Sequence, residues 1–222
     1  MICQIQNLNI EIDQKLLISN FSYNFFSEKI YFFFGHIGAG KSLLLETIAK
    51  LRTAKAGQIL WSQPEKISFL FQKNSLIPWL TVAENLNLLD IESTDDAQIL
   101  FNKLGIEKLL LKKADVLSGG EIQKVNFYRA ILNKPDVIFA DEPFNSLDIF
   151  EKKIMYQALT EYIKQSKSMV FWVSHDLIEI KNFADEVLCF DKLTTKHSQT
   201  ILKENLNLEA LSEFISGVLE KP

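Results

Sequence analysis

Cysteine is scarce in this sequence, with only Cys3 and Cys189 among 222 residues. The two are far apart and form no Cys-x-x-Cys or Cys/His grouping, so we expect two reduced thiols rather than a metal or redox site. Histidine is also scarce, with three residues, and nothing pairs His36 or His197 into the spacing of a metal site. These two histidines are expected to be structural or surface residues.

Long apolar runs are also missing. Stretches such as Ile30–Phe34 and Met169–Val173 have the length of a strand, whereas a membrane helix needs about 20 residues. The start, Met1–Ile12, lacks the basic flank, apolar core and cleavage site of an export signal. We therefore expect no membrane-spanning segment and a cytoplasmic location.

An excess of positive charge is absent as well, since the formal net charge is −4. A nucleic-acid partner is therefore not expected. The hydrophobic content of 47% and the 17 phenylalanines indicate a globular chain with buried aromatic residues. At this length the chain can bury one sizeable α/β domain, and it shows no internal repeat or low-complexity linker.

The pattern of apolar residues predicts an α/β order of elements. Alternation up to Phe26 predicts short antiparallel strands, and Thr81–Leu132 has mostly helix-forming residues. Strands are expected at Ile30–Phe34, Gly57–Trp61, Ile67–Phe71, Val137–Ala140, Met169–Val173 and Glu186–Phe190, and helices at Lys41–Leu51, Ile149–Lys164 and Asp176–Phe183. This alternation implies a parallel sheet. The tail, Asn205–Leu219, is expected to be an amphipathic helix that packs on the body.

A glycine-rich loop stands between a predicted strand and a predicted helix. It satisfies the pattern G-x-x-x-x-G-K-[ST] with residues Gly35, His36, Ile37, Gly38, Ala39, Gly40, Lys41 and Ser42. In such a loop backbone N–H groups and the helix N-terminus surround phosphates, the lysine reaches the outer phosphates, and the hydroxyl binds Mg²⁺. The sequence therefore predicts a phosphate-binding loop.

Two carboxylates follow the buried strand that ends at Ala140. Asp141 is expected to hold the metal, directly or through water, and Glu142 to polarise the water that attacks the γ-phosphate. His175 follows another predicted strand, so its imidazole could donate to the γ-phosphate at the same sheet edge. Alone, the two carboxylates would be catalytic about as often as structural, and pairing with the glycine loop favours catalysis. A lone histidine at such a position would usually be structural.

A second anion-binding segment precedes the helix of the middle region. In Leu117–Glu121, Ser118 can cap a helix while Gly119 and Gly120 expose backbone donors. One nucleotide needs one cradle per chain, so a second anion loop makes sense if it closes on the nucleotide of another copy. The sequence therefore predicts a dimer.

Together these motifs resemble the ATP-binding cassette (ABC) ATPases over nearly the whole chain. The resemblance implies an α/β fold with a P-loop NTPase (RecA-like) core, an N-terminal antiparallel β subdomain and an inserted helical signature subdomain. It implies one domain over 1–222, in which 1–74 and 133–222 form the core with the β subdomain and 75–132 form the helical subdomain. The cofactors implied are ATP and Mg²⁺.

The resemblance also assigns roles to individual residues. Gln72 is similar to the glutamine that senses Mg²⁺ and the attacking water, and Asn145–Asp148 is similar to the loop that crosses the dimer interface. His175 resembles the switch histidine, and Glu142 the catalytic base. Leu117–Glu121 resembles the signature segment, in which Glu121 replaces the usual glutamine.

The implied partners are a second cassette, identical or paired, transmembrane permease subunits and an extracytoplasmic solute-binding protein. The cassette would lie at the inner face of the cell membrane through its permease. Phe71–Asn85 is similar to cassettes of nitrate, sulfonate and taurine importers, which favours import of a small solute. A lipoprotein-release, cell-division or other export system, a soluble cassette and a binding module without hydrolysis are the alternatives.

One departure from the family concerns the nucleotide base. Residues Leu8–Lys15 offer Ile10 and Ile12 where the family commonly has an aromatic residue that stacks on adenine. Isoleucine can cover a purine by dispersion but lacks an extended π surface, so weaker selectivity for adenine is expected.

Overall fold

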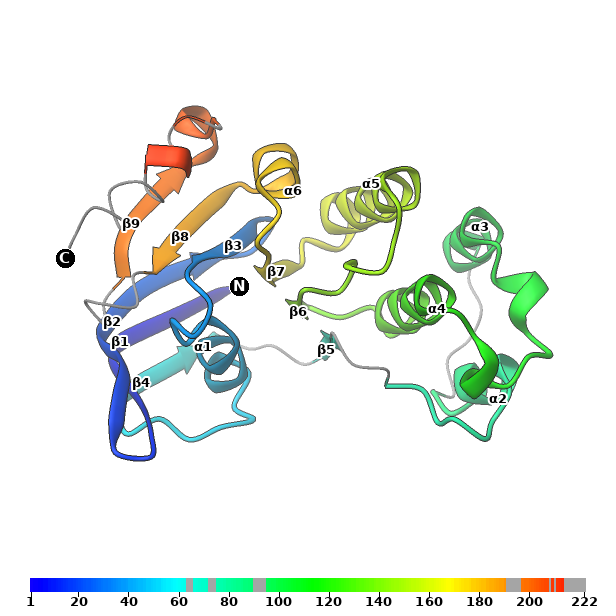
Figure 1. Ribbon diagram of the computed structural model, residues 1–222, viewed down its shortest axis with the longest axis horizontal. Coiled ribbons are helices and arrows are strands. Elements are labelled where there is room, and N and C mark those ends of the chain that lie inside the picture. The colour runs from blue at the N-terminus through cyan, green and yellow to red at the C-terminus, as the bar shows by residue number, and fades with distance from the viewer. Residues whose placement is uncertain are drawn as a thin grey trace. The chain divides into compact units, whose positions relative to one another are not determined.

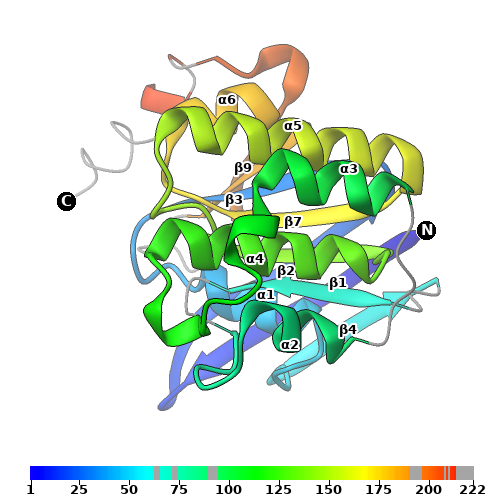
Figure 2. The same ribbon diagram turned by 90° about the vertical axis from the view of Figure 1, so that its right-hand side faces the viewer.

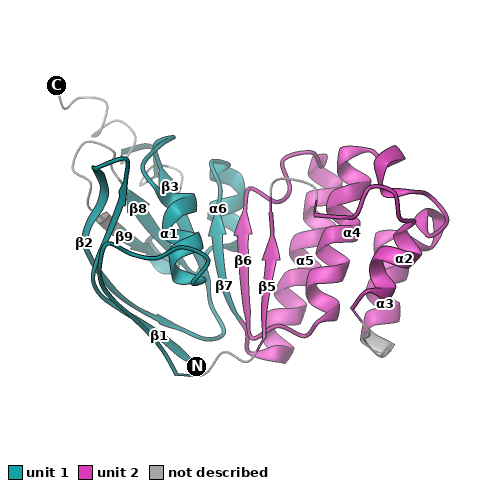
Figure 3. Ribbon diagram, turned by 90° about the horizontal axis from the view of Figure 1, so that it is seen from below, with its two compact units in different colours: residues 1–65, 169–222 teal, residues 66–168 magenta. Residues whose placement is uncertain are grey.

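A computed structural model describes residues 1–62, 66–71, 75–89, 95–190, 197–207, 209 and 211–213. The chain divides into two compact units, coloured separately in Figure 3. Unit 1 contains residues 1–65 and 169–222, and unit 2 contains residues 66–168. Each unit is described by itself below.

Unit 1 begins with a long hairpin. Strand β1 (Ile2–Ile12) pairs antiparallel with β2 (Lys15–Phe26), and β4 (Ala56–Trp61) pairs antiparallel with the other edge of β1. The turn residues Asp13 and Gln14 have φ values of 47° and 64°, as a type I′ turn requires. The sequence predicted short antiparallel strands here. The structure has antiparallel strands, but β1 and β2 are long, with 11 and 12 residues. Register shifts interrupt their pairing, which blurs the alternation that the sequence shows.

The second sheet of unit 1 carries the apolar runs. Its strand order is β7 (Met169–Val173), β3 (Ile30–Gly35), β8 (Glu186–Phe190) and β9 (His197–Leu202). The pairs β3–β7 and β3–β8 are parallel, as predicted, and all residues of these three strands are buried. Strand β9 pairs antiparallel with β8 and was not predicted, because its polar composition resembles a loop.

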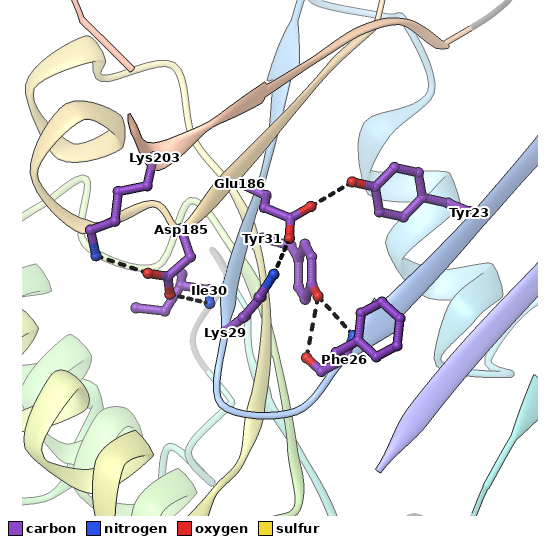
Figure 4. A network of polar contacts seen from close by, with 8 residues as sticks. All are labelled: Tyr23, Phe26, Lys29, Ile30, Tyr31, Asp185, Glu186 and Lys203. Carbon is purple, nitrogen blue, oxygen red and sulfur yellow. Dashed lines mark hydrogen bonds and ion pairs between the residues drawn. The ribbon is translucent and has the colours of Figure 1, made fainter. Parts of the chain in front are cut away.

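A polar network ties the antiparallel hairpin to the second sheet of unit 1 (Figure 4). The carboxylate of Glu186 accepts a hydrogen bond from the Tyr23 hydroxyl at 2.5 Å and pairs with the ammonium of Lys29. Burial, followed by the bond to Glu186, raises the pKa of Tyr23. Nearby, Asp185 accepts from the backbone N–H of Ile30 at 2.9 Å. These contacts hold the first residue of β3, Ile30, in place. The glycine loop begins at the opposite end of the same strand.

In the tail, residues 209 and 211–213 are helical, and the described part of unit 1 has three further helical elements. They are α1 (Lys41–Ile48), α6 (Leu177–Phe183) and the short 3-10 helix η3 (Lys203–Asn205). A loop connects β3 to α1 (Figure 1), and α1 packs against β3 and β7. Much of the predicted tail helix, including 208, 210 and 214–219, lies outside the described residues.

Unit 2 has a parallel strand pair and a set of helices. Strand β5 (Ile67–Leu70) pairs with β6 (Val137–Asp141) in parallel, as predicted. The helical elements are α2 (Val82–Asn87), α3 (Asp95–Leu104), η1 (Ile106–Leu109), η2 (Ala114–Val116), α4 (Gly119–Leu132) and α5 (Ile149–Ser166). Helices α3, α4 and α5 pack against one another (Figure 2). The predicted helical character of Thr81–Leu132 is thus present in its described residues.

Within the described ranges, we find no helix with the length and hydrophobicity that crossing a bilayer requires.

Candidate nucleotide-binding site

The glycine loop joins the end of β3 to the start of α1 in unit 1. Gly35 has a φ of 139°, and a Cβ at this position would come within 2.1 Å of the Phe190 carbonyl oxygen. Gly38 and Gly40 also have positive φ values, 81° and 88°. Only glycine adopts these conformations without strain. The three glycines therefore allow the tight turn from β3 into α1.

The Lys41 side chain stabilises this turn by hydrogen bonds to the loop backbone. This side chain is buried, and its ammonium donates to the carbonyl of Gly35 at 2.9 Å and to that of His36 at 2.8 Å. The ammonium of Lys41 thus lies against the backbone at the start of the loop. Ser42, the next residue, lies in the first turn of α1 and is partly exposed. Ile37, by contrast, projects from the loop and is 82% exposed.

His175 lies at the same sheet edge as the glycine loop. Strands β7 and β3 are parallel neighbours, with Phe33 opposite Val173, so Gly35 and His175 each follow that pair by two residues. Asp176 caps α6 by accepting from the backbone N–H groups of Ile178 and Glu179. Unit 1 therefore brings His175 to the edge that carries the glycine loop, as the sequence predicts.

The predicted catalytic carboxylates lie at the end of β6 in unit 2. Asp141 is the last residue of the strand, and Glu142 follows with a left-handed φ of 46°. A glutamate in this conformation is unusual, and such positions are frequent at functional sites. The Asn145 side chain donates to the Glu142 carboxylate at 2.6 Å. This contact orients the carboxylate, and the sequence analysis did not identify it.

The signature segment begins α4 in the same unit. Ser118 is the N-cap of α4: its hydroxyl accepts from the N–H of Glu121 at 3.2 Å, and the Glu121 carboxylate accepts from the N–H of Ser118 at 2.8 Å. This reciprocal arrangement is a capping box. Ser118 and Gly119 are exposed. The predicted N-cap of Ser118 is therefore present, and the first turn of α4 presents backbone N–H groups.

The segment Asn145–Asp148 packs directly on this first turn. A Cβ on Gly119 would lie 3.1 Å from the Ser146 side chain, so the glycine permits the close approach. The side chain of Gln123 accepts from the Ser146 N–H at 3.2 Å. Asp148 caps α5 by accepting from the N–H groups of Phe150 and Glu151 at 2.9 and 2.8 Å. Asp148 thus has a local structural role beside the interface role that the family resemblance implies.

The hairpin β1–β2 lies against the glycine loop. The Cβ of Leu17 and the Cγ1 of Ile18 would each be 3.4 Å from a Cβ on Gly40. Ile10 is fully buried and cannot cover a base, whereas Ile12 at the end of β1 is partly exposed. Of the two isoleucines considered from the sequence, only Ile12 therefore has exposed surface.

Two further predictions concern the metal. Gln72 lies outside the described residues, whereas Ser42 and Asp141 lie in different units. Among the residues that the structure describes, no three histidine, cysteine, aspartate or glutamate side chains gather into a metal-binding cluster. Magnesium held together with a nucleotide uses one or two protein side chains and the phosphates, so Ser42 and Asp141 fit that chemistry.

The comparisons with known proteins agree with these motifs. The family described as ABC transporter matches residues 18–145, which is more than half of the chain. The zinc import ATP-binding protein ZnuC of Haemophilus influenzae is 33% identical, with 85% of this chain and 71% of that protein aligned. The thiamine import ATP-binding protein ThiQ of Haemophilus ducreyi is 30% identical over 82% of this chain and 92% of that protein.

A solved structure shares the fold. It is a dimeric bacterial ABC transporter cassette, with a TM-score of 0.78, 24% identity, and coverage of 91% of this chain and 99% of that one. The similarity to nitrate, sulfonate and taurine importers stays a prediction. The sequence motifs, the strand–loop–helix geometry and the comparisons lead to the same conclusion: the chain belongs to the ABC transporter family, as an ATP-binding cassette with the P-loop NTPase fold.

Proposed function

We propose that this chain is the subunit of an ABC transporter that binds and hydrolyses ATP and so energises import of a small solute. The observation that carries the proposal is the loop Gly35–Ser42, in which three glycines and a buried lysine form a phosphate-binding turn before α1. The ATP-binding importer relatives support the direction of transport.

The residues of the loop bind the phosphates in this proposal. Its backbone N–H groups and the N-terminus of α1 face the negative charge, and Lys41 exchanges its two carbonyl partners for phosphate oxygens. Ser42 and Asp141 would hold Mg²⁺, with Gln72, and the ion would neutralise phosphate charge. Glu142, oriented by Asn145, accepts a proton from the attacking water, and His175 donates to the γ-phosphate.

A second copy of the cassette completes the site. Ser118, Gly119 and Gly120 present donors at the first turn of α4, where a phosphate bound to another copy is favoured. Asp148 and its neighbours reach the interface from the segment that packs on this turn. We propose 75–132 as the helical subdomain that carries the signature within a single cassette over 1–222.

The membrane permease is the proposed second partner. Trp79, Leu111 and Val116 are 71%, 90% and 68% exposed, and backbone hydrogen bonds join the segments that carry them. Exposed apolar side chains of this kind are typical of protein–protein contacts. Docking there would hold the cassette at the inner face of the membrane, and a solute-binding protein would deliver the solute from outside.

The test is Mg²⁺-dependent phosphate release by the purified chain, alone and with its permease. We expect hydrolysis by the wild type and its loss in Lys41→Ala, because that variant lacks the cation that faces the phosphates. An Lys50→Ala variant, at an exposed lysine just beyond α1, is the control and should hydrolyse normally. Hydrolysis that persists in Lys41→Ala, or a wild type without hydrolysis in both settings, would contradict the proposal.

A further inference from the structure

Two segments of unit 2 form one backbone ladder. The N–H of Val82 donates to the carbonyl of Lys112 at 2.9 Å, and that of Ala114 donates to the carbonyl of Leu80 at 2.9 Å. Thr81 and Lys113 form a β-bridge at the centre. We call residues 78–83 and 110–115 the strap. Because paired backbone segments move together, the strap is a single element that precedes the signature segment.

One side chain connects the strap to the signature capping box. The ammonium of Lys112 lies 2.8 Å from Oε1 of Glu121, and Oε2 of the same carboxylate accepts from the Ser118 N–H at 2.8 Å. The Ser118 hydroxyl accepts in turn from the N–H of Glu121. Lys112 therefore contacts the carboxylate that sets the conformation of Ser118, although it does not contact Ser118 itself.

The residue at position 121 matters for this contact. A carboxylate can accept from Lys112 with one oxygen and from Ser118 with the other, and both bonds are charge-assisted. A glutamine could still accept one bond through its amide oxygen, but it would form no ion pair with Lys112. The ion pair between Lys112 and residue 121 is therefore possible only when the signature segment ends in glutamate instead of glutamine.

We propose that Lys112 is a positioning residue for hydrolysis: its ion pair with Glu121 holds Ser118 and the first turn of α4 in the orientation that meets the nucleotide of the second copy. The inference rests on the proposed function, because it gives Ser118 a role at the phosphate. Exposed ion pairs contribute little to folding stability, and the Lys112 side chain is 46% exposed. A purely structural role would therefore leave activity nearly unchanged.

The experiment compares full-length variants in steady-state hydrolysis, ATP binding and thermal unfolding. Lys112→Met removes the charge and keeps the side-chain stem. We expect kcat to fall about tenfold, because a misplacement of about 1 Å can cost roughly 100-fold and Lys112 acts only through Glu121. The affinity of the single chain for ATP and the melting temperature should stay at wild-type values. Lys112→Arg should restore most of the activity, and Lys108→Met, at an exposed lysine of η1, should leave it unchanged.

A double variant tests whether the two side chains act as one unit. Glu121→Gln should lower kcat like Lys112→Met, and the combination should cost no more than either change alone. Wild-type activity in Lys112→Met, or additive losses in the double variant, would overturn the inference while leaving the ATPase proposal intact. A wild type without hydrolysis would instead overturn the proposed function on which the inference rests.

Discussion

At the scale of single residues, the hairpin beside the glycine loop has an aliphatic surface. Ile12 is partly exposed, and the hairpin residues that approach Gly40, Leu17 and Ile18, are aliphatic. Aliphatic groups contact a purine by dispersion and offer no hydrogen bond that distinguishes adenine from guanine. We expect contacts with the base at this surface to add affinity through buried area, but to add little selectivity for adenine over guanine.

We therefore predict that ATP and GTP bind with dissociation constants within about tenfold of each other, or about 1.4 kcal/mol. Ile12→Tyr should improve ATP affinity, because stacking adds about 1 kcal/mol beyond area burial. Leu16→Tyr is the matched control: it stands opposite Glu11 and so on the other face of the hairpin from Ile12. Competition titration with a fluorescent nucleotide measures both effects, and a strong preference of the wild type for ATP would count against the prediction.

The sequence predicted local conformation best where that conformation depends on neighbouring residues. The positive φ values of Gly38 and Gly40 follow from the loop motif, and the N-cap of Ser118 follows from its place before helix-forming residues. The bond from Asn145 to Glu142 could not be predicted in the same way, because it depends on the left-handed turn at Glu142. Likewise, the two carbonyl partners of Lys41 depend on how the loop folds in three dimensions.

At the scale of elements, the described strands that are buried along their whole length were all predicted, whereas one strand at the border of a sheet was missed. Strands β3, β7 and β8 are buried along their whole length, so their sequences are continuous apolar runs. Strand β9 borders the sheet and was missed, and the register shifts between β1 and β2 hid the true length of both strands. The pairing of edge strands depends on neighbours distant in sequence, which periodicity does not report.

The carboxylate of Glu186 joins elements of unit 1, and its replacement is expected to lower stability. It is largely buried between β2, the turn at Lys29 and β8. Glu186→Gln leaves Lys29 without its ion pair and weakens the bond from Tyr23. We expect the free energy of unfolding to fall by about 1–3 kcal/mol, the range for a lost hydrogen bond to a charged group.

Urea denaturation measures this change, and Lys203→Met supplies the comparison. Lys203 pairs with Asp185 at 2.8 Å, and its side chain is 65% exposed, so its removal should cost at most about 1 kcal/mol. A loss in Lys203→Met that equals or exceeds the loss in Glu186→Gln would show that burial of the Glu186 network is not what stabilises this part of unit 1.

At the scale of the whole molecule, the proposed chemistry needs two copies. Unit 1 supplies the glycine loop and His175, and unit 2 supplies Glu142 and the signature turn at Ser118. A phosphate bound to the loop of one copy gains donors from the signature turn of the other, so ATP should stabilise the dimer and hydrolysis should release it. A variant that binds ATP but does not hydrolyse it should accumulate as a dimer.

The most direct measurement is the mass of Glu142→Gln in solution by light scattering, with and without Mg²⁺ and ATP. The substitution removes the proton acceptor and leaves the phosphate-binding loop intact, so we predict the mass of two chains with ATP and of one chain without it. Adding Ser118→Arg to Glu142→Gln should return the mass to one chain while ATP still binds. A single-chain mass for Glu142→Gln with ATP bound would contradict a site completed by the signature turn of a second copy.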